Sequence, residues 1–283
     1  MKSPSLLPNI KPQQESKRIK TFIKKTFKTA KRKSAVLTLS GGVDSSTTLT
    51  LAAQALSPAQ IMVLKLPYHS SHPQSISNAD LAIKHNKIPK RNVFEVNIGP
   101  SVDRIWKTIL IKCSPSQTGQ SKIANQIRLG NIMTRVRMIY AFDMARARVG
   151  LAIGTENKSE NLLGYFTRFG DEASDLEPLK HLYKTQVFAL AQHLELPEEI
   201  LQSPPTAGLW AEQTDQEELE FTYSTADQVL YLHSEKKMSP IQIAKKLLNS
   251  TREKTETYWK RRVSKVLERV KKSDFKHYVP YSL

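Results

Sequence analysis

The sequence has few of the features that define several classes of protein. Its 283 residues include one cysteine, Cys113, which excludes an internal disulfide framework and a zinc site built on several cysteines, and is typical of a reducing compartment. No apolar run approaches the roughly 18 residues that a membrane-spanning helix needs. Residues 1–10 are too short and too broken by proline for a signal peptide. We therefore expect a cytoplasmic protein that does not enter a membrane.

Acidic residues are scarce beside basic ones, 26 against 43, which gives a formal net charge of +17. The excess lies at the two ends: residues 1–33 hold 11 Lys and Arg against one acid, and residues 252–276 hold 10 against four. Such ends can bind nucleic acid, anionic lipid or a polyanionic small molecule, although a solvated helix face is the simpler interpretation. Nucleic acid is not an expected partner, but the charge does not exclude it.

The chain up to residue 155 alternates short apolar runs with helical patterns. Strands are predicted at 35–39, 61–66, 93–98 and 151–153, and helices at 16–32, 44–55, 78–85, 102–112 and 123–148. This alternation predicts an α/β fold, a doubly wound and mainly parallel sheet with helices on both faces. Ligands of such sheets bind beyond the carboxyl ends of the strands.

The remaining segments complete the predicted organisation. Residues 1–15 are rich in proline and are expected to be flexible, residues 114–120 to form a mobile loop, and residues 156–182 to be irregular. The C-terminal part is expected to be helical, over 184–194, 225–233, 240–248 and 253–272. We treat 16–283 as a single domain.

The segment Ser40-Gly41-Gly42-Val43-Asp44-Ser45-Ser46 lies between a predicted strand and a predicted helix. Two glycines allow a tight turn, and the free amides of a helix start suit a phosphate or pyrophosphate. Asp44 adds a carboxylate where a phosphate-bound Mg²⁺ would lie. The alternative is an ordinary turn in which Asp44 or Ser45 caps the helix. We favour the phosphate interpretation; the string resembles the pyrophosphate loop of N-type ATP pyrophosphatases.

The segment Gly154-Thr155-Glu156-Asn157-Lys158-Ser159-Glu160 follows the fourth strand. Asn157 and Glu160 have the spacing of a capping box at a helix start. The functional alternative makes Glu160 a second Mg²⁺ carboxylate opposite Asp44, but the spacing alone favours the cap.

A third segment, residues 164–184, is polar with no clear period. Such a loop is functional or disordered, and its aromatic residues Tyr165, Phe166 and Phe169 argue against disorder.

The block from Gly154 to Tyr223 resembles ammonia-dependent NAD synthetases. It contains G-T-E-N-K-S-E, G-Y-F-T-R-F-G-D-E-A-S-D, H-L-Y-K-T-Q-V and P-P-T-A-G-L-W in the order of that family. With the loop at Ser40–Ser46, the resemblance covers roughly residues 16–283. It implies an adenine nucleotide α-hydrolase-like fold and a ligase that amidates deamido-NAD with ammonia and ATP. An NAD-adenylate would be the intermediate, and NAD, AMP and pyrophosphate the products.

The resemblance also implies roles for individual residues. Asp44 and Glu160 match the Mg²⁺ ligands, which favours the metal role for Glu160 over a cap alone. ATP-binding positions match Thr38, Leu39, Ser40, Gly41, Gly42, Val43, Asp44, Ser45, Ser46, Thr155, Lys184 and Thr206. Deamido-NAD positions match Arg135, Arg168, Asp175, Phe275 and Lys276. Asp44, Glu160, Lys184 and Asp175 form the predicted catalytic set, in which Asp175 would bind or deprotonate ammonium.

Three positions depart from the family pattern: Arg168 replaces a usual Lys, Glu172 a frequent Gly, and Phe275 a frequent His. The chain has no room for the amidase domain of glutamine-dependent members, so the resemblance implies free ammonia, or ammonia from a separate partner, as the nitrogen source. Family members are homodimers with the long helix at the interface. The apolar residues implied there are Ile123, Ile127, Ile132, Met133, Val136, Ile139 and Tyr140, although burial within one subunit is the simpler interpretation.

Two other functions compete with this interpretation. A tRNA-modifying ATP pyrophosphatase would share the phosphate loop and make use of the basic charge. A non-catalytic nucleotide-binding scaffold would keep the loop without the chemistry. The single cysteine argues against thiolation of tRNA, and Asp44, Glu160 and Lys184 argue against a scaffold.

Overall fold

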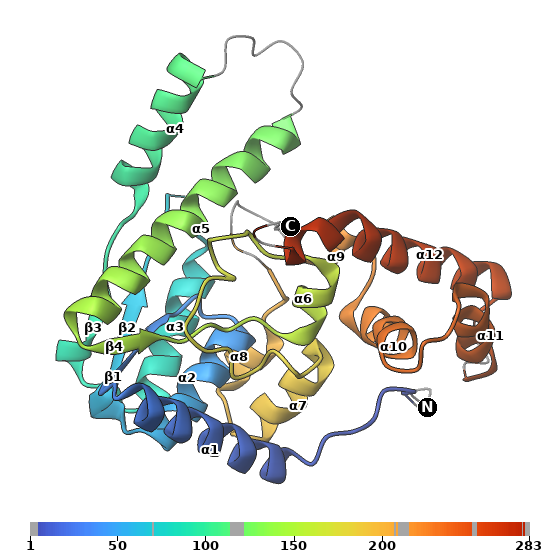
Figure 1. Cartoon of the computed structure of the whole chain (residues 1–283), viewed down its shortest axis with the longest axis horizontal. Coiled ribbons are helices and arrows are strands. Elements are labelled where there is room, and N and C mark those ends of the chain that lie inside the picture. The colour runs from blue at the N-terminus through green and yellow to red at the C-terminus, as the bar shows by residue number, and fades with distance from the viewer. Residues whose placement is uncertain are drawn as a thin grey trace.

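A parallel sheet forms the centre of the computed structural model, which describes residues 5–69, 71–113, 122–206, 208, 215–250, 254–278 and 280. The strands are β1 (Ser34–Thr38), β2 (Ile61–Lys65), β3 (Val93–Glu95) and β4 (Gly150–Ala152). Their order across the sheet is β3-β2-β1-β4, and every pair is parallel (Figure 1). The predicted parallel sheet is therefore confirmed.

Helices cover both faces of the sheet because each strand is apolar on both sides. Ala35 and Leu37 of β1 pack on one face with α1 (Pro12–Ala30), α2 (Val43–Ala55), α3 (Pro73–His85) and α7 (Lys184–His193). Val36 packs on the other face with α4 (Gly99–Cys113) and α5 (Lys122–Ala147). This alternation of side chains gives the doubly wound arrangement that the sequence predicts.

The C-terminal part builds a second apolar cluster beside the sheet. It comprises α6 (Lys158–Leu163), α10 (Tyr223–Ser234), α11 (Pro240–Ser250) and α12 (Glu256–Ser273), followed by the 3₁₀ turn η3 (Asp274–His277) (Figure 1). Trp259 and Val263 of α12 are buried there together with Leu230 of α10. The predicted helical C-terminal part is confirmed.

Short helices are where the structure departs most from the sequence-based expectation. The region expected to be irregular contains α6, and α8 (Glu198–Gln202) and α9 (Asp215–Leu219) were not expected. Helices of five or six residues are too short to show a 3.6-residue period.

The third strand ends at Glu95 rather than at 98, although the amide of Val96 still donates to the carbonyl of Lys65. Helix α3 begins at Pro73, five residues early, because proline suits a first helical turn.

The N-terminal segment contacts the fold before the expected start of the domain. Helix α1 begins at Pro12, so residues 12–15 are helical. Leu7 is 6% exposed and lies in the C-terminal apolar cluster. The side-chain amide of Gln186 donates to the carbonyl of Pro8 at 2.9 Å. The expected mobile loop at 114–120 lies outside the described residues.

Candidate active site

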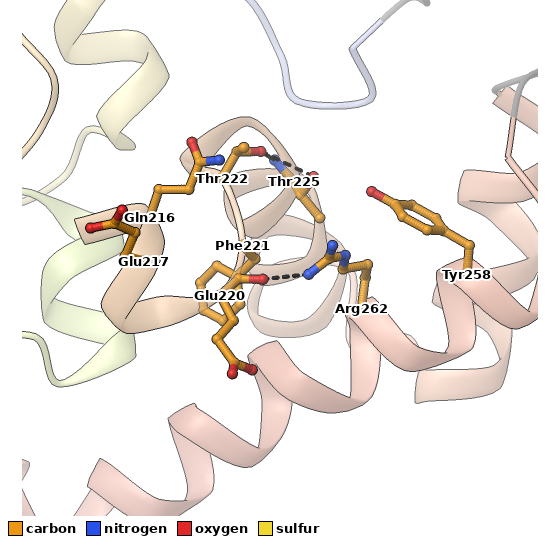
Figure 2. Close-up of a pocket in the computed structure, with 8 residues that line it drawn as sticks. All are labelled: Gln216, Glu217, Glu220, Phe221, Thr222, Thr225, Tyr258 and Arg262. Atoms are coloured by element: carbon orange, nitrogen blue, oxygen red, sulfur yellow. Dashed lines mark hydrogen bonds between the residues drawn. The ribbon is translucent and has the colours of Figure 1, made fainter. Parts of the chain in front are cut away.

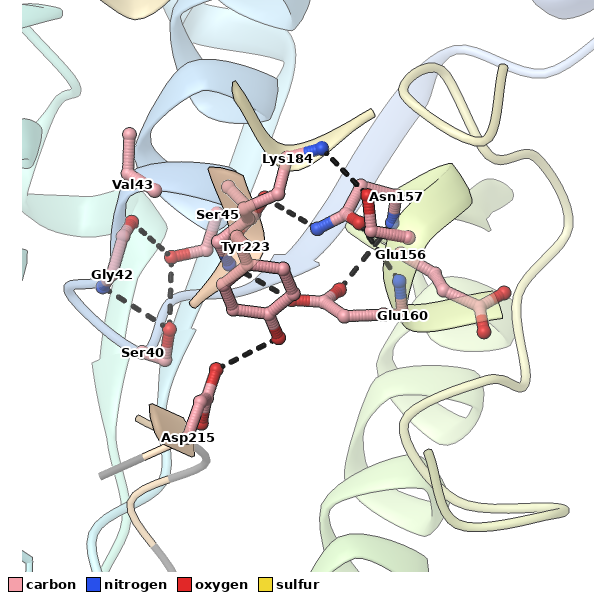
Figure 3. A network of polar contacts seen from close by, with 12 residues as sticks. Ser40, Gly42, Val43, Ser45, Glu156, Asn157, Glu160, Lys184, Asp215 and Tyr223 are labelled. Carbon is pink, nitrogen blue, oxygen red and sulfur yellow. Dashed lines mark hydrogen bonds and ion pairs between the residues drawn. The ribbon is translucent and has the colours of Figure 1, made fainter. Parts of the chain in front are cut away.

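The turn after β1 requires glycine at position 41. Gly41 has φ of +81°, and a Cβ there would lie 2.1 Å from the carbonyl oxygen of Ser75 on α3. The chain then enters α2 through Gly42, which leaves the first amides of that helix without intrahelical partners. The hydroxyls of Ser40 and Ser45 lie 3.0 Å apart across the turn (Figure 3). The turn therefore has the amides and hydroxyls that a phosphate group needs.

Other members of the predicted loop have structural roles. Leu39 is 5% exposed in the sheet core, and Val43 packs against Ala191 and Leu196. Ser46 is fully buried on α2. For these positions only the main chain is available to a ligand, whereas Ser40 and Asp44 reach the carboxyl edge of the sheet with their side chains.

The turn after β4 begins α6 with the predicted capping box. Asn157 Oδ1 accepts a hydrogen bond from the amide of Glu160 at 3.0 Å, and Glu160 Oε2 accepts from the amide of Asn157 at 3.4 Å. The other end of Asn157 donates to Asp44 Oδ1 at 2.9 Å. Because β1 and β4 are neighbours in the sheet, one amide side chain joins the two turns.

Lys184, the first residue of α7, bridges the two predicted metal carboxylates. Its Nζ atom lies 2.5 Å from Asp44 Oδ2 and 2.8 Å from Glu160 Oε1. Figure 3 shows Lys184 and Glu160 in this cluster. Its side chain is 4% exposed, and those of Asp44 and Glu160 are 14% and 16% exposed. Glu160 therefore caps α6 with one carboxylate oxygen and pairs with Lys184 through the other.

Burial and charge oppose each other at this cluster. Burial lowers the pKa of Lys184, but the adjacent carboxylates of Asp44 and Glu160 outweigh it and raise that pKa above its ordinary value, so the ammonium stays protonated. Burial raises the pKa of Glu160, Lys184 opposes the shift, and the nearby charge of Asp44 adds to it. Removing the lysine would leave two carboxylates facing each other with little water to screen them.

Two side chains that the sequence analysis missed complete the cluster. The ring of Tyr223, at the start of α10, lies with its centroid 5.1 Å from Lys184 Nζ (Figure 3). Its hydroxyl donates to Asp215 Oδ2 at 2.9 Å. Burial raises the pKa of Asp215, and Lys184 opposes that shift. Both residues lie in the block that carries the family resemblance, but no local pattern indicates that they meet Lys184.

A fully buried carboxylate, Asp227 of α10, holds the two helices that carry Glu160 and Lys184. Its Oδ1 accepts from the hydroxyl of Ser159 at 2.5 Å, and its Oδ2 accepts from the amide of Thr185 at 2.9 Å and from the hydroxyl of Thr185 at 2.7 Å. Ser159 Oγ in turn accepts from the amide of Lys184. Acceptors at helix N-termini satisfy amides that have no intrahelical partner. Asp227 thereby fixes the first turns of α6 and α7 relative to each other.

Four of the five predicted deamido-NAD residues form a second group: Arg135, Arg168, Phe275 and Lys276. Arg135 Nε of α5 donates to the carbonyl of Arg168 at 3.2 Å, and the guanidinium of Arg168 lies over the ring of Phe275. Lys276 Nζ donates to the carbonyls of Gly164 and Phe166 at 2.7 and 2.6 Å. These contacts bring α5, the loop after α6 and η3 together.

Asp175, Thr155 and Thr206 stand apart from both groups. Asp175 Oδ2 accepts a hydrogen bond from the amide of Ala152 at 2.7 Å, so its carboxylate lies along the end of β4. In the described part of the chain no hydrogen bond or ion pair joins it to Asp44, Glu160 or Lys184. Thr155 is partly buried in the turn after β4, and Thr206 is exposed.

The donor set at the carboxyl edge suits a magnesium ion. Mg²⁺ is bound in nucleotide enzymes by one or two carboxylates together with substrate phosphates. Asp44 and Glu160 supply two carboxylates beside a turn with free amides. Among the described residues no group of three or more His, Cys, Asp or Glu forms an all-protein metal cage. The residues fit an ion that is shared with a phosphate.

A pocket of about 200 Å³ lies away from these groups, between α9, the start of α10 and α12 (Figure 2). It is lined by Glu220, Thr222, Tyr258 and Arg262 among others, and contains none of the predicted site residues. The guanidinium of Arg262 crosses it to donate to the carbonyl of Glu220.

Within the described residues no helix is long and apolar enough to cross a membrane.

Comparison with known proteins assigns the chain to a family. The family model named NAD synthase matches residues 15–280, which is nearly the whole sequence. The chain belongs to the NAD synthase family. An NH(3)-dependent NAD(+) synthetase of Fusobacterium nucleatum is 34% identical over 259 residues, which cover 92% of this chain and 91% of that protein. One from Chlorobium phaeobacteroides is 39% identical over 77% of this chain and 73% of that protein.

Solved structures of the NAD synthase fold agree with this assignment. An NMN synthetase from Francisella tularensis superposes with a TM-score of 0.78 at 26% identity, over 97% of this chain and 99% of that one. An NH3-dependent NAD synthetase from Campylobacter jejuni superposes with a TM-score of 0.73 at 26% identity over the same shares. The α/β fold and its helical C-terminal part are therefore shared with NAD synthetases.

Proposed function

We propose that the protein is an ATP-dependent ligase that amidates deamido-NAD with ammonia. The observation that carries the proposal is the convergence of Lys184, Asp44 and Glu160 at the carboxyl ends of β1 and β4, next to a glycine turn. Membership of the NAD synthase family over residues 15–280 supports it, as do relatives named for the same activity.

The reaction has two balanced steps. A carboxylate oxygen of the nicotinate attacks the α-phosphorus of ATP, the bond to the β-phosphate oxygen breaks, and pyrophosphate leaves. Ammonia then attacks the acyl carbon of the adenylate, the acyl–oxygen bond breaks, and AMP leaves as one proton is lost. The first step brings two anions together, so positioning and charge stabilisation account for most of the catalysis.

The residues of the cluster match these demands. The amides after Gly42 and the hydroxyls of Ser40 and Ser45 would bind phosphate oxygens. Lys184 would pair with phosphate oxygens as a point charge. Asp44 and Glu160 would hold Mg²⁺, which when bound neutralises charge on those oxygens. The ammonium of Lys184, 2.5 Å from Asp44 Oδ2, balances the charge of that carboxylate.

We assign the second group to the dinucleotide substrate. Arg135 and Arg168 would face its phosphates, and Phe275 would hold Arg168 in place through the ring contact. Lys276, held by two carbonyls, would fix the loop that carries Phe166. Asp175 would receive ammonium, with its carboxylate oriented by the amide of Ala152. Thr38, Leu39, Thr155 and Thr206 would complete the ATP site.

The acid mononucleotide is a second candidate substrate. The observation that favours it is the superposition of this chain on a protein described as an NMN synthetase, with a TM-score of 0.78.

The experiment that separates the two substrates is to incubate the protein with ATP, Mg²⁺, ammonium and either deamido-NAD or nicotinic acid mononucleotide. We expect NAD and AMP in equal amounts with the dinucleotide, and a lower kcat/KM with the mononucleotide. The reverse preference would overturn the substrate assignment.

The rival functions have their own readouts. A scaffold would release no pyrophosphate with either substrate. A tRNA-modifying enzyme would require tRNA for ATP cleavage to AMP and pyrophosphate. Exchange of labelled pyrophosphate into ATP that depends on deamido-NAD and proceeds without ammonia supports the adenylate and contradicts both rivals.

We also propose that the protein is a cytoplasmic homodimer whose contact includes α5. Of the apolar residues implied there, Met133 and Val136 are buried within the subunit, whereas Ile123, Ile127 and Ile139 are 65%, 43% and 58% exposed. Contiguous exposed apolar surface marks protein interfaces, and Ile123 and Ile127 lie one helical turn apart on α5. Light scattering should give twice the monomer mass, and Ile127→Asp with Ile139→Asp should give the monomer. A monomeric wild type would contradict this proposal.

A further inference from the structure

The segments that precede the strands carry a concentration of positive charge. Lys31, Arg32 and Lys33 precede β1, Lys90 and Arg91 precede β3, and Arg146 and Arg148 precede β4. We propose that these seven residues, the amino-edge patch, bind the phosphate backbone of a duplex nucleic acid. This function is separate from the proposed ligase activity.

Hydrogen bonds fix these segments side by side. The amide of Lys33 donates to the carbonyl of Val149 at 3.2 Å, which joins the segments before β1 and β4. The side-chain amide of Gln60 donates to the carbonyl of Lys33 at 3.0 Å. That of Asn92 donates to the carbonyl of Ala59 at 2.9 Å, which extends the chain of contacts to β3. The seven charges thus lie on one rigid edge of the sheet rather than on independent loops.

The charge of the patch is not compensated by acids. All seven side chains are exposed, and the four segments 31–33, 58–60, 90–92 and 146–149 contain no Asp or Glu. Within the described ranges none of the seven forms an ion pair with a carboxylate. Like charges held together repel and reduce stability, and a polyanion relieves that repulsion. A chain of phosphates supplies the matching charge.

The shape of the patch favours a duplex over a single strand. Single-stranded nucleic acid is bound on exposed aromatic side chains, and the four segments contain no aromatic residue. Four parallel strands spaced about 4.8 Å apart place the outer segments roughly 14 Å from each other. That width matches the roughly 12 Å major groove of B-form DNA, so the patch can reach phosphates on both sides of that groove.

A membrane is a poorer match for the same charge. A basic helix that binds lipid inserts its apolar face among the acyl chains. The apolar face of α1, which runs into the patch, is occupied: Ile19, Ile23 and Phe27 are buried in the sheet core. The exposed large apolar side chains of α1 and of the patch segments are Phe22, at 45%, and Val149, at 53%. The patch therefore offers charge with little to insert.

The patch lies at the edge of the sheet opposite the candidate active site. The strands run from Lys33 and Arg148 toward Asp44 and the turn after β4, so a duplex on the amino edge leaves the carboxyl edge open. Binding of nucleic acid and turnover of a nucleotide substrate can therefore be measured separately.

The test is fluorescence anisotropy with a labelled duplex RNA and a labelled duplex DNA of about two helical turns. The patch variant combines Lys31→Glu, Arg32→Glu, Lys90→Glu and Arg91→Glu. The control variant combines Lys236→Glu, Lys237→Glu, Lys245→Glu and Lys246→Glu, four exposed lysines near the junction of α10 and α11 with the same change in net charge. Circular dichroism and thermal melting verify that both variants fold, and Arg146→Ala with Arg148→Ala is a milder second patch variant.

We expect the patch variant to bind at least about tenfold more weakly near physiological salt, with the slope of log K against log salt reduced by about 3. The control should change affinity less than about threefold, as a long-range charge effect. Equal weakening in both variants, or no binding by the wild type at about 100 mM salt, would overturn the proposal. So would preferential binding of anionic lipid vesicles that competes with the duplex and is lost in the patch variant.

Discussion

Lys184 Nζ lies 2.5 Å from Asp44 Oδ2, which places the first residue of one helix against the first turn of another. The two residues are separated by 140 positions in the chain. They meet because β1 ends, and α7 begins, at the same edge of the sheet. The contact brings a cation, a carboxylate and free amides together where a triphosphate would lie. Its removal should therefore affect both stability and chemistry.

Replacing Lys184 by methionine separates these two effects. Asp44 and Glu160 would face each other without the ammonium, and an uncompensated buried charge costs about 3–5 kcal/mol. We expect Lys184→Met to lower the melting temperature in EDTA, and Mg²⁺ to raise it more in the variant than in the wild type. Differential scanning fluorimetry with increasing Mg²⁺ measures this. An equal response to Mg²⁺ in the two proteins would contradict a cation site between the carboxylates.

Removing either carboxylate should abolish Mg²⁺-dependent turnover while the fold persists. Asp44→Ala and Glu160→Ala each delete one proposed ligand, and losing such an electrostatic group costs at least about 100-fold in rate. Release of pyrophosphate is the measurement. Asp103→Ala, an exposed carboxylate that pairs with His69, is the matched control and should keep wild-type rates. Wild-type turnover in Asp44→Ala or Glu160→Ala would exclude the metal assignment.

Asp227 should act on turnover through Lys184 rather than through substrate. Asp227→Asn keeps one acceptor oxygen but cannot satisfy both Ser159 and Thr185. We expect kcat to fall about tenfold or more, with KM for ATP within about threefold, since the phosphate turn is untouched. Gln228→Ala, at the next position of α10, is the control. A rise in KM alone would indicate that Asp227 serves binding instead of the position of Lys184.

The pH dependence of stability should contain a contribution from Glu177. Burial raises the pKa of Glu177 to about 8, and the charge of Glu156 adds to the shift. The unfolded pKa is about 4.3, so between about pH 4.3 and 8 the folded state holds a proton that the unfolded state has lost. The free energy of unfolding therefore falls as pH rises through this window and levels off above it.

The variant Glu177→Gln removes this titration. Glutamine resembles the protonated acid: its oxygen can accept from the amide of Glu156 and its nitrogen can donate to Ser174 Oγ. Melting temperatures measured from about pH 5 to 8 should decline less steeply in the variant than in the wild type. Parallel curves would show that Glu177 is ionised throughout the window.

The N-terminal segment should stabilise the C-terminal helices. Leu7 is buried among them, and Glu15 Oε1 lies 2.6 Å from His181 Nε2, just before α7. Leu7→Ala should cost about 2–4 kcal/mol, as for other buried leucines, and deletion of residues 1–15 should cost more. Urea unfolding measures both, with Leu6→Ala, a partly buried neighbour, as the milder comparison. An unchanged midpoint of urea unfolding in the deletion variant would support the flexible segment that the prolines predict.

Much of the fold was predictable because long elements carry periodic signals. The apolar runs at 35–39 and 61–66 and the helical pattern over 123–148 give β1, β2 and α5 within one residue at each end. The length of α6 is not predictable from a hydrophobic period, because its six residues contain less than two turns. Its capping box was predicted, since that signal is local to Asn157 and Glu160.

The candidate site was predictable where its residues belong to motifs. Asp44 and Glu160 follow strands that end at one edge, so their proximity follows from the topology. Tyr223 and Asp227 come from a helix in a different apolar cluster, and packing between clusters leaves no local pattern. One signal was present for Asp227: it lies beside Ala226 on the buried face of α10, where a carboxylate needs partners.

In the proposed reaction the nicotinate carboxylate is adenylylated before ammonia attacks. The most direct test uses deamido-NAD labelled with ¹⁸O in that carboxylate, together with ATP, Mg²⁺ and ammonium, and mass spectrometry of the products. Each AMP should carry one ¹⁸O in its phosphate, and AMP and NAD should form in equal amounts. Unlabelled AMP, or ADP with labelled phosphate, would contradict the proposed reaction.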